Sequence, residues 1–302
     1  MRDYNSALMA KSSDSIYWQI AQRNLGVYSR EEQQKLREGK VAIVGVGCDG
    51  GMDAYILARM GIGKLGLIDF DRNELSNLNR QPMATFSTIG QPKVLAAAQI
   101  IKDLNPTTEV VPIDQKLTEE NAEDLIKGFD VVLQGMDSIV GRIIAHRAAL
   151  KRLIPSVAMT GQPPFRSIVS TLMPNGPNYE ELFGIEFVRN KLFRDHPEMA
   201  EQIENLKMER AEHASRQHAS AGWLERYKVG QEGWGITPER AYITSIFQCH
   251  EAIALLVGRT PKAIAPKAYV SDLNGLSEFG KDDSLVAIMN PPNGKNWDYR
   301  AF

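Results

Sequence analysis

Residues 41–50, Val-Ala-Ile-Val-Gly-Val-Gly-Cys-Asp-Gly, decide the fold of this chain. The run from 41 to 46 is apolar and of strand length, which is typical of a strand buried on both faces of a parallel sheet. It continues into the pattern Gly45-x-Gly47-x-x-Gly50 and then into a helix-compatible stretch. In this arrangement the glycines allow a tight turn, a close approach of the backbone to phosphate, and close packing of the helix on the strand. Strand, glycine turn and helix together predict a cradle for a nucleotide.

Strand and helix patterns alternate through most of the chain. Further strands are predicted at 64–71, 109–112, 130–134, 156–159, 167–172 and 268–271, and helices at 31–39, 91–104, 119–128 and 241–258. The helix at 31–39 begins with a capping box formed by Ser29 and Glu32, whereas the 28 residues before this box are polar and irregular. Alternating elements predict an α/β fold with a Rossmann-like, doubly wound and mostly parallel sheet.

The chain divides into four predicted regions. They are an N-terminal arm and helix (1–40), a nucleotide-binding core (41–184), a helical insertion (185–238), and a helix and strand that complete the core (239–302). The insertion is charged and lacks a strong strand pattern, so we expect it to cover the sheet or contact a partner, and to choose the substrate. Its tryptophans, Trp223 and Trp234, are expected to anchor it against the sheet.

The composition excludes several classes of protein. With 302 residues the chain is long enough for one large or two ordinary domains. Its 35 basic and 37 acidic side chains give a formal charge of -2, which offers no bulk attraction to nucleic acid or an anionic membrane. Two cysteines, Cys48 and Cys249, cannot make a disulfide framework or a four-cysteine zinc site. The sequence shows neither a signal peptide nor an apolar run of about 20 residues, so a cytoplasmic location is expected.

A carboxylate ends the second predicted strand. Asp69 lies 19 residues beyond Gly50, a position from which it can accept hydrogen bonds from ribose hydroxyls. Up to this point an NAD-dependent oxidoreductase explains the sequence as well as an ATP-binding protein does.

Three further motifs favour an ATP-binding protein over an NAD-dependent oxidoreductase. They are Asp-Phe-Asp-Arg-Asn-Glu-Leu-Ser-Asn-Leu-Asn-Arg-Gln at 69–81, Ile-Gly-Gln-Pro-Lys at 89–93 and Met-Asp-Ser at 136–138. Their residue types, together with separations of 11, 13 and 44 positions between Asp69, Arg80, Lys93 and Asp137, resemble the ThiF/MoeB superfamily of ubiquitin-activating-enzyme-like adenylyltransferases. The resemblance runs from about residue 19 to 184 and resumes in the helix that ends at Gly258.

The resemblance implies that a carboxylate is activated by ATP. A carboxylate that attacks the α-phosphate builds negative charge on the phosphoryl oxygens and expels pyrophosphate, so the site must hold cations in place. By resemblance, Arg80 and Lys93 contact the phosphates and Asp137 binds Mg2+. The alternative for Asp137 is that it caps the helix that follows.

The resemblance also implies supporting contacts to the nucleotide. Asn77 and Gln81 would line the cleft, and Asp71 would help Asp69 with the ribose. Members of the superfamily often supply an N-terminal arginine to the phosphates, in some cases across a homodimer interface. Arg23 matches this arginine in some branches, other branches place it about where Trp18 stands, and a plain surface charge is the alternative for Arg23.

The sequence departs from the family in three respects. Asp49 lies inside the glycine turn, where a carboxylate favours the helix N-terminus but repels a phosphate, so either its side chain points away or nucleotide binding is weak. The Cys-x-x-Cys pairs of zinc-binding members are missing, so no structural zinc is expected. No cysteine clearly matches the thioester-forming one, because Cys249 is expected in the core and Cys48 beneath the nucleotide.

These observations predict an adenylyltransferase that uses ATP and Mg2+. Its substrate would be the C-terminal carboxylate of a small ubiquitin-like or sulfur-carrier protein, or a peptide, and the acyl-adenylate would react without an enzyme thioester. The resemblance implies a homodimer, no membrane association is expected, and the near-neutral charge disfavours nucleic acid. Two alternatives stay open: a catalytically silent nucleotide-binding or interaction protein, and an NAD-dependent oxidoreductase, which would leave Arg80, Lys93 and Asp137 unexplained.

Overall fold

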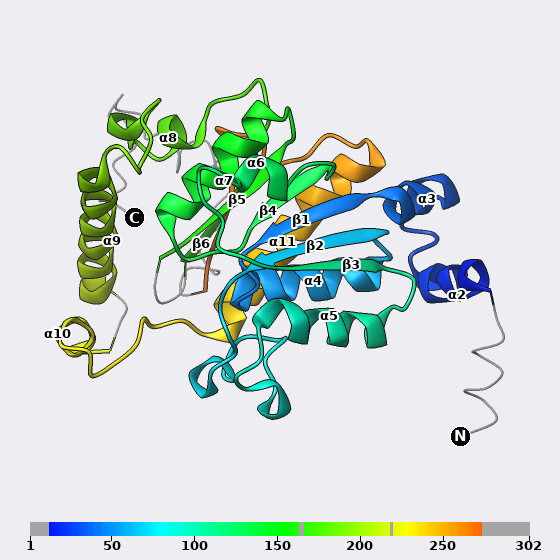
Figure 1. Ribbon diagram of the computed structural model, residues 1–302, viewed down its shortest axis with the longest axis horizontal. Coiled ribbons are helices and arrows are strands. Elements are labelled where there is room, and N and C mark those ends of the chain that lie inside the picture. Colours follow the sequence, from blue (N-terminus) through cyan, green and yellow to red (C-terminus); the bar gives the residue numbers. More distant parts are fainter. Residues whose placement is uncertain (1–11, 163–165, 218–219, 274–302) are drawn as a thin grey trace.

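A seven-stranded sheet forms the centre of the computed structural model, which describes residues 12–162, 166–217 and 220–273 (Figure 1). The strands are β1 (Lys40–Val44), β2 (Lys64–Asp69), β3 (Glu109–Asp114), β4 (Val131–Gln134), β5 (Ser156–Gln162), β6 (Arg166–Leu172) and β7 (Tyr269–Asp272). They are arranged in the order β3-β2-β1-β4-β5-β6-β7. All neighbours from β3 to β5 pair in parallel, whereas β6 runs antiparallel to both β5 and β7. Every predicted strand is therefore present, and the Rossmann-like α/β fold is confirmed.

Helices cover both faces of the sheet. They are α2 (Ser13–Ile20), α3 (Arg30–Glu38), α4 (Cys48–Met60), α5 (Lys93–Leu104), α6 (Ala122–Leu125), α7 (Ile139–Lys151), α8 (Tyr179–Leu182), α9 (Pro197–Gln217), α10 (Trp223–Lys228) and α11 (Pro238–Val257). Figure 1 shows α4, α5 and α11 on one face, and α6 and α7 on the other. Val41 and Ile43 of β1 are buried with the first group, and Ala42 and Val44 with the second, as the alternation of side chains along a strand requires.

The insertion folds as helices at one end of the sheet. Its long helix α9 contacts α7 and β5, and buries Met199 and Ile203 among their side chains. Trp223 and Trp234 lie with their ring centroids 5.6 Å apart, in a small cluster with Tyr227. The expectation that these tryptophans anchor the insertion on the sheet is therefore corrected, because the cluster is built from side chains of the insertion itself.

The N-terminal arm contains a helix where an irregular segment was expected. The Ser12 hydroxyl accepts a hydrogen bond from the backbone N–H of Ser15 and so caps α2. The buried Tyr17 hydroxyl then donates to the carbonyl oxygens of Gln33 and Gly61, at 2.9 and 3.1 Å. These long-range contacts, which a local pattern does not contain, hold α2 in place. Within the residues described, no helix combines the length and apolar character needed to cross a membrane.

Candidate functional site

A cavity of about 470 Å³ opens at the carboxyl ends of β1, β2 and β4. We call it the glycine-loop cavity, because Gly45 and Gly47 line it together with Asp69, Lys93 and Asp137. The neighbours β1 and β4 are separated in the chain by β2 and β3, so the cavity lies where the strand order reverses. In open α/β sheets this is the usual place for a ligand.

The glycine turn joins β1 to α4 at the floor of this cavity. Gly45 has a φ of +88°, and a Cβ there would meet the backbone nitrogen of Met136 at 2.7 Å. A Cβ at Gly50 would lie 1.8 Å from the carbonyl oxygen of Gly45, so only glycine lets the helix pack this closely on the turn. Gly47 is the N-cap of α4, whose first N–H groups have no partner within the helix. This helix N-terminus is therefore a site for an anion.

Asp69 fixes the geometry of the turn. Its Oδ2 accepts a hydrogen bond from the backbone N–H of Val46 at 2.6 Å, and its Oδ1 accepts one from the N–H of Asp71 at 2.9 Å. The side chain is 9% exposed and lines the cavity. Each carboxylate oxygen keeps a further lone pair that can accept a hydrogen bond from a ribose hydroxyl. This contact stays a prediction.

Lys93, Asp71 and Gln81 line the same cavity, whereas Asn77 does not. Lys93 is the first residue of α5, and its ammonium group is 2.8 Å from the carboxylate of Asp71, which holds the lysine toward the cavity. Gln81 lines the cavity, but its Oε1 is buried and has no hydrogen-bond partner among the described residues, so a contact between this side chain and a ligand stays a prediction. Asn77 lines neither this cavity nor its neighbour, and its Oδ1 accepts the backbone N–H of Glu74.

Asp137 lies just beyond β4 with its carboxylate exposed to the cavity. The N-cap of α7 is Ser138, whose hydroxyl accepts the N–H of Gly141 at 3.1 Å, so the alternative that Asp137 caps this helix is wrong. Among the residues that the structure describes, the Asp137 carboxylate has no hydrogen-bond or ion-pair partner. An oxygen ligand of this kind would fit a hard cation such as Mg2+ if phosphates lay beside it.

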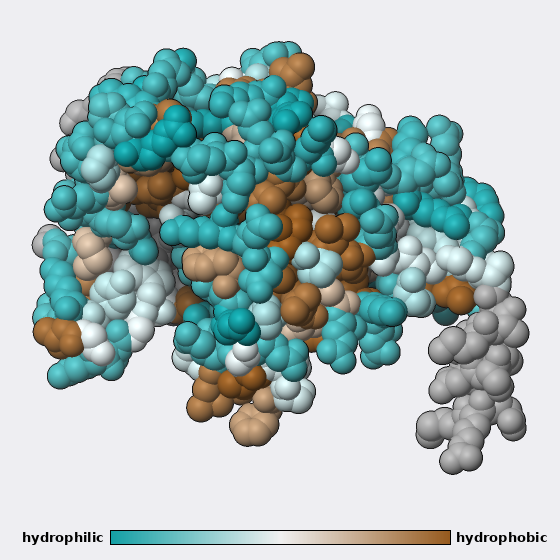
Figure 2. Space-filling view, in the orientation of Figure 1, coloured by the Kyte–Doolittle hydropathy of each residue, from teal (hydrophilic) through white to brown (hydrophobic). Residues whose placement is uncertain are grey.

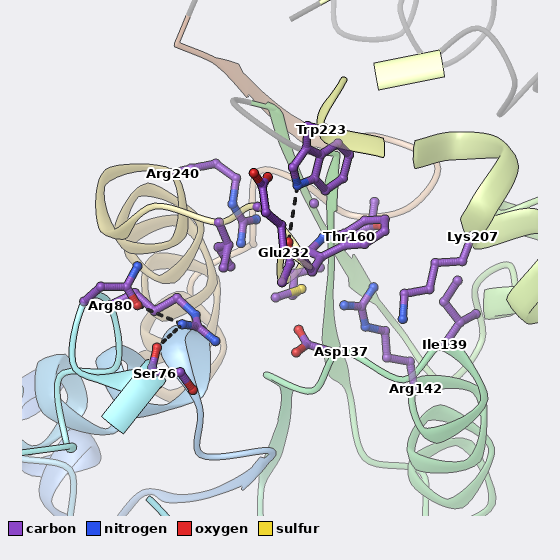
Figure 3. Close-up of a pocket in the computed structure, with 17 residues that line it drawn as sticks. Ser76, Arg80, Asp137, Ile139, Arg142, Thr160, Lys207, Trp223, Glu232 and Arg240 are labelled. Carbon is purple, nitrogen blue, oxygen red and sulfur yellow. Dashed lines mark hydrogen bonds between the residues drawn. The ribbon is translucent and has the colours of Figure 1, made fainter. Parts of the chain in front are cut away.

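A second cavity, of about 580 Å³, adjoins the first. We call it the insertion cavity, because Lys207, Trp223 and Trp234 of the insertion line it together with Thr160 of β5. Figure 3 shows Lys207, Trp223 and Thr160 around it. Arg80 and Asp137 line both cavities and so mark the boundary between them. The Arg80 guanidinium is held there by hydrogen bonds to the carbonyl oxygen of Ser76 and the Oδ1 of Asn79, both 2.8 Å long.

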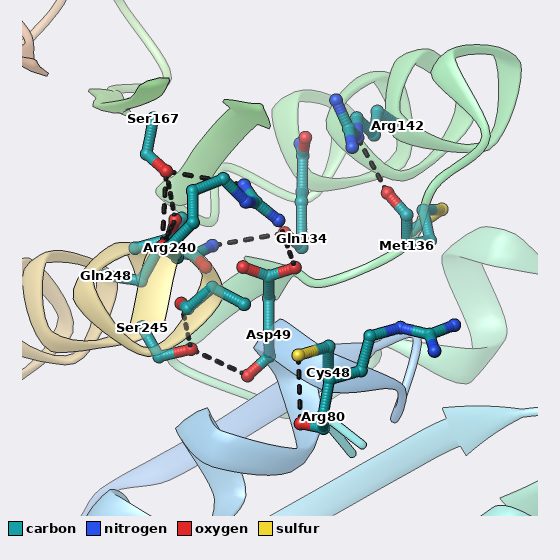
Figure 4. Close-up of polar contacts among 12 residues, drawn as sticks. Cys48, Asp49, Arg80, Gln134, Met136, Arg142, Ser167, Arg240, Ser245 and Gln248 are labelled. Atoms are coloured by element: carbon teal, nitrogen blue, oxygen red, sulfur yellow. Dashed lines mark hydrogen bonds and ion pairs between the residues drawn. The ribbon is translucent and has the colours of Figure 1, made fainter. Parts of the chain in front are cut away.

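Asp49 does not line either cavity. Its side chain faces α11, where a carboxylate oxygen lies 3.6 Å from the guanidinium of Arg240 (Figure 4). Burial raises the pKa of Asp49 to about 6, although the charge of Arg240 opposes this shift. Of the two alternatives stated for Asp49, the structure therefore favours a side chain that points away from the glycine turn.

Neither thiol is prepared for nucleophilic chemistry. Burial raises the pKa of Cys48 to about 12, and its Sγ lies 3.0 Å from the carbonyl oxygen of Arg80. Burial also raises the pKa of Cys249 well above its ordinary value, and this side chain packs in the core as expected. A thiolate is the reactive form of cysteine, and these environments disfavour it at neutral pH.

Arg23 lies away from both cavities of its own chain. It is exposed at the end of a short 3-10 helix (Ala21–Arg23), and the next residue, Asn24, donates to the carbonyl oxygen of Met60 at the C-terminal end of α4. The glycine-loop cavity is at the other end of α4, whose 13 residues span about 20 Å. Arg23 therefore does not reach a nucleotide bound in the glycine-loop cavity of its own chain. A contact across a homodimer interface stays a prediction.

Three cations of the insertion cavity were not identified from the sequence: Arg142, Lys207 and Arg240. Arg142 is buried on α7 five residues after Asp137, and Arg240 is buried near the start of the apolar helix α11. A charge in an otherwise apolar segment is the feature that could have singled out Arg142 and Arg240, whereas Lys207 lies among the many charges of the insertion.

Comparison with known proteins shows which sequences and folds this chain resembles. A tRNA threonylcarbamoyladenosine dehydratase of Bacillus subtilis is 38% identical over 140 residues, which are 46% of this chain and 55% of that protein. A molybdopterin-synthase adenylyltransferase of Haemophilus influenzae is 34% identical over 169 residues, which are 54% of this chain and 65% of that protein. The chain thus spans less than two thirds of the length of each.

A solved structure shows the same fold over most of the chain. It is the E. coli tRNA N6-threonylcarbamoyladenosine dehydratase in complex with ATP, with a TM-score of 0.56 and 20% identity, and it covers 80% of this chain and 95% of its own. The model of the ThiF family matches residues 21–282 of the sequence. This protein therefore belongs to the ThiF family.

Proposed function

We propose that this protein is an ATP-dependent adenylyltransferase that activates a carboxylate. The observation that carries the proposal is the pair of adjoining cavities with Arg80 and Asp137 at their boundary. ATP would occupy the glycine-loop cavity, with its phosphates at the N-terminus of α4. The carboxylate would enter from the insertion cavity and meet the α-phosphorus at the boundary.

The residues at the boundary would stabilise the transition state of one displacement. An oxygen of the carboxylate forms a bond to the α-phosphorus, the bond to the β-phosphate oxygen breaks, and pyrophosphate leaves with that electron pair. Arg80 and Lys93 offset the negative charge that develops on the phosphoryl oxygens. Asp137 would hold Mg2+, which neutralises phosphate charge when it is bound.

The substrate would be the C-terminal carboxylate of a sulfur-carrier or ubiquitin-like protein, or of a peptide. The molybdopterin-synthase relative supports a protein substrate, whereas the dehydratase relatives are named for a tRNA nucleoside. The formal charge of -2 favours the protein or peptide over tRNA. With both thiols buried and their pKa values raised, the acceptor would attack the acyl-adenylate directly.

Exchange of labelled pyrophosphate into ATP tests the proposal. The panel contains a sulfur-carrier protein ending in Gly-Gly, short peptides, and tRNA carrying threonylcarbamoyladenosine. Exchange should depend on the carboxylate, and Arg80→Ala and Asp137→Asn should each reduce it by about a hundredfold or more because both stabilise transition-state charge. Asp103→Asn, at an exposed position of α5, should leave it unchanged.

The outcomes separate the alternatives. If only the tRNA supports exchange, the proposed adenylyl transfer is correct, but the substrate is a tRNA nucleoside and not a protein or peptide. ATP binding without exchange on any acid would favour a silent nucleotide-binding protein, and binding of NADH but not ATP would favour an oxidoreductase.

We further propose a homodimer in which Arg23 serves the partner's nucleotide. Arg23 is exposed and cannot reach the cavity of its own chain, so only another copy could bring it there. Apolar surface for such an association lies on the loops around Leu75 and Phe86, which are 66% and 82% exposed (Figure 2). These loops lead directly to and from Arg80.

A further inference from the structure

We infer that the insertion cavity recognises an acidic side chain of the substrate, close to the carboxylate that is activated. This inference rests on the proposed function and names the substrate class: a peptide, or a protein tail, with a Glu or Asp near its C-terminus. It follows from the charges that line the cavity and from where they lie relative to the boundary.

Two cations reach into this cavity from different helices. Arg142 on α7 is only 5% exposed, and its Nε donates to the carbonyl oxygen of Met136 at 2.8 Å. Lys207 on α9 forms an ion pair with Glu204 of the same helix at 3.5 Å. The Glu204 side chain is 55% exposed, so water screens this pair. Figure 3 shows the ends of Arg142 and Lys207 pointing toward the same part of the cavity.

The carboxylates that line this cavity are Asp137 and Glu232. In the proposed function Asp137 holds Mg2+ at the boundary, and Glu232 forms an ion pair with Arg226, so neither is left to pair with Arg142 and Lys207. Arg240 pairs with Asp49 at 3.6 Å. Among the described residues, Arg142 forms no ion pair with a carboxylate. Like charges that approach each other in a partly desolvated cavity are unfavourable unless an anion lies between them. The cavity is therefore suited to a ligand that brings a negative charge.

The anionic group that Arg142 and Lys207 would bind is not the carboxylate that reacts with ATP. Arg80 and Asp137 line both cavities, so the carboxylate that attacks the nucleotide must lie beside them. Arg142 and Lys207 line only the insertion cavity. The anion that they bind is thus a second group of the same substrate. Trp223 and Trp234 offer an apolar wall for the methylene groups that connect the two.

Calorimetry with matched dipeptides tests the inference. N-acetyl-Glu-Gly and N-acetyl-Gln-Gly are titrated into the full chain, which is saturated with Mg2+ and α,β-methylene-ATP. The acidic peptide should bind about tenfold more tightly or better, as expected for a partly buried charge pair. Lys207→Met should lower the ratio of affinities severalfold because only Arg142 remains, and Lys207→Glu should lower it further.

Lys102→Met, on the exposed surface of α5, is the matched control and should keep the wild-type ratio. The Lys207 side chain is itself 27% exposed, so its substitution should not prevent folding, which thermal unfolding checks. Equal affinities for the two peptides, no measurable binding of the acidic peptide, or an unchanged ratio in Lys207→Met would each overturn the inference. Weaker binding of the nucleotide with an unchanged peptide ratio would show that the cations serve the phosphates instead. Pyrophosphate exchange tests the proposed function independently, because it does not depend on this preference.

Discussion

Asp49 and Arg240 form a buried ion pair beneath the glycine turn. The carboxylate is 2% exposed, one of its oxygens has no hydrogen-bond partner among the described residues, and burial raises its pKa to about 6. Asp53, one turn later on α4, is also buried, and burial raises its pKa well above the ordinary value. Arg240 thus compensates a negative charge that would oppose a phosphate at the start of α4.

The raised pKa of Asp49 predicts how stability depends on pH. A carboxyl whose pKa is higher in the folded than in the unfolded state stabilises the fold below its unfolded pKa of about 3.8, and this contribution is lost as the pH rises through about 6. Between pH 4 and pH 7 the wild type should therefore lose about 2 kcal/mol more of its free energy of unfolding than Asp49→Asn does. Urea denaturation at several pH values measures the difference.

Asp103→Asn is the control, since it removes an exposed carboxylate from α5 and should leave the pH profile unchanged. Asp49→Asn can be less stable than the wild type at every pH because Arg240 loses its partner. The test still holds, because it compares how the free energy of unfolding changes with pH in the two proteins. Parallel profiles for the wild type and Asp49→Asn would contradict the raised pKa.

The sequence predicted some residues of the site better than others. Arg80, Lys93, Gln81 and Asp137 were predicted from the resemblance of short motifs to the ThiF/MoeB superfamily, and all four line the glycine-loop cavity. The partner of Asp49 could not be predicted in this way. Arg240 comes from the far end of the chain, and only the packing of α11 on α4 brings the two together.

At the scale of elements, the contact between α4 and the glycine turn sets the shape of the proposed nucleotide site. Gly50→Ala places a Cβ 1.8 Å from the carbonyl oxygen of Gly45, so the helix must move away. We expect the free energy of unfolding to fall by about 1–3 kcal/mol or more, with loss of ATP binding. Chemical denaturation and calorimetry measure the two effects.

Gly51→Ala is the matched control on the same helix. A Cβ there meets Pro82 at 3.4 Å, an ordinary contact, and alanine in a helix is favoured over glycine by about 0.5–1 kcal/mol. Stability equal to or above that of the wild type is expected. Equal behaviour of the two variants would mean that close packing at Gly50 does not control the turn.

Prediction of the elements succeeded where the pattern is local. The strands, the capping box of α3 and the helix α11 follow from apolar runs and capping residues. The helix α2 did not, because Tyr17 is held by backbone groups of Gln33 and Gly61 that lie far along the chain. The cluster of Trp223 and Trp234 was also misplaced, since a side chain's partner cannot be read from its own segment.

At the scale of the whole molecule, the position of Arg23 makes the proposed dimer testable. An Arg23→Ala chain and an Asp137→Asn chain should each be inactive in pyrophosphate exchange. In a random mixture, half of the dimers contain one of each, and one of their two sites is intact, so about a quarter of the wild-type activity should return. No recovery, although mixed dimers form, would show that Arg23 does not act across the interface.

In the proposed function Asp137 holds a metal against the phosphates of ATP in the glycine-loop cavity. Calorimetric titration of ATP with and without Mg2+, in the wild type and in Asp137→Asn, tests this claim without any knowledge of the acyl substrate. We expect Mg2+ to strengthen ATP binding by about tenfold or more in the wild type, and to have little effect in the variant, which lacks the anionic ligand. An equal effect of Mg2+ on both proteins, or no binding of ATP to the wild type, would contradict this role of Asp137.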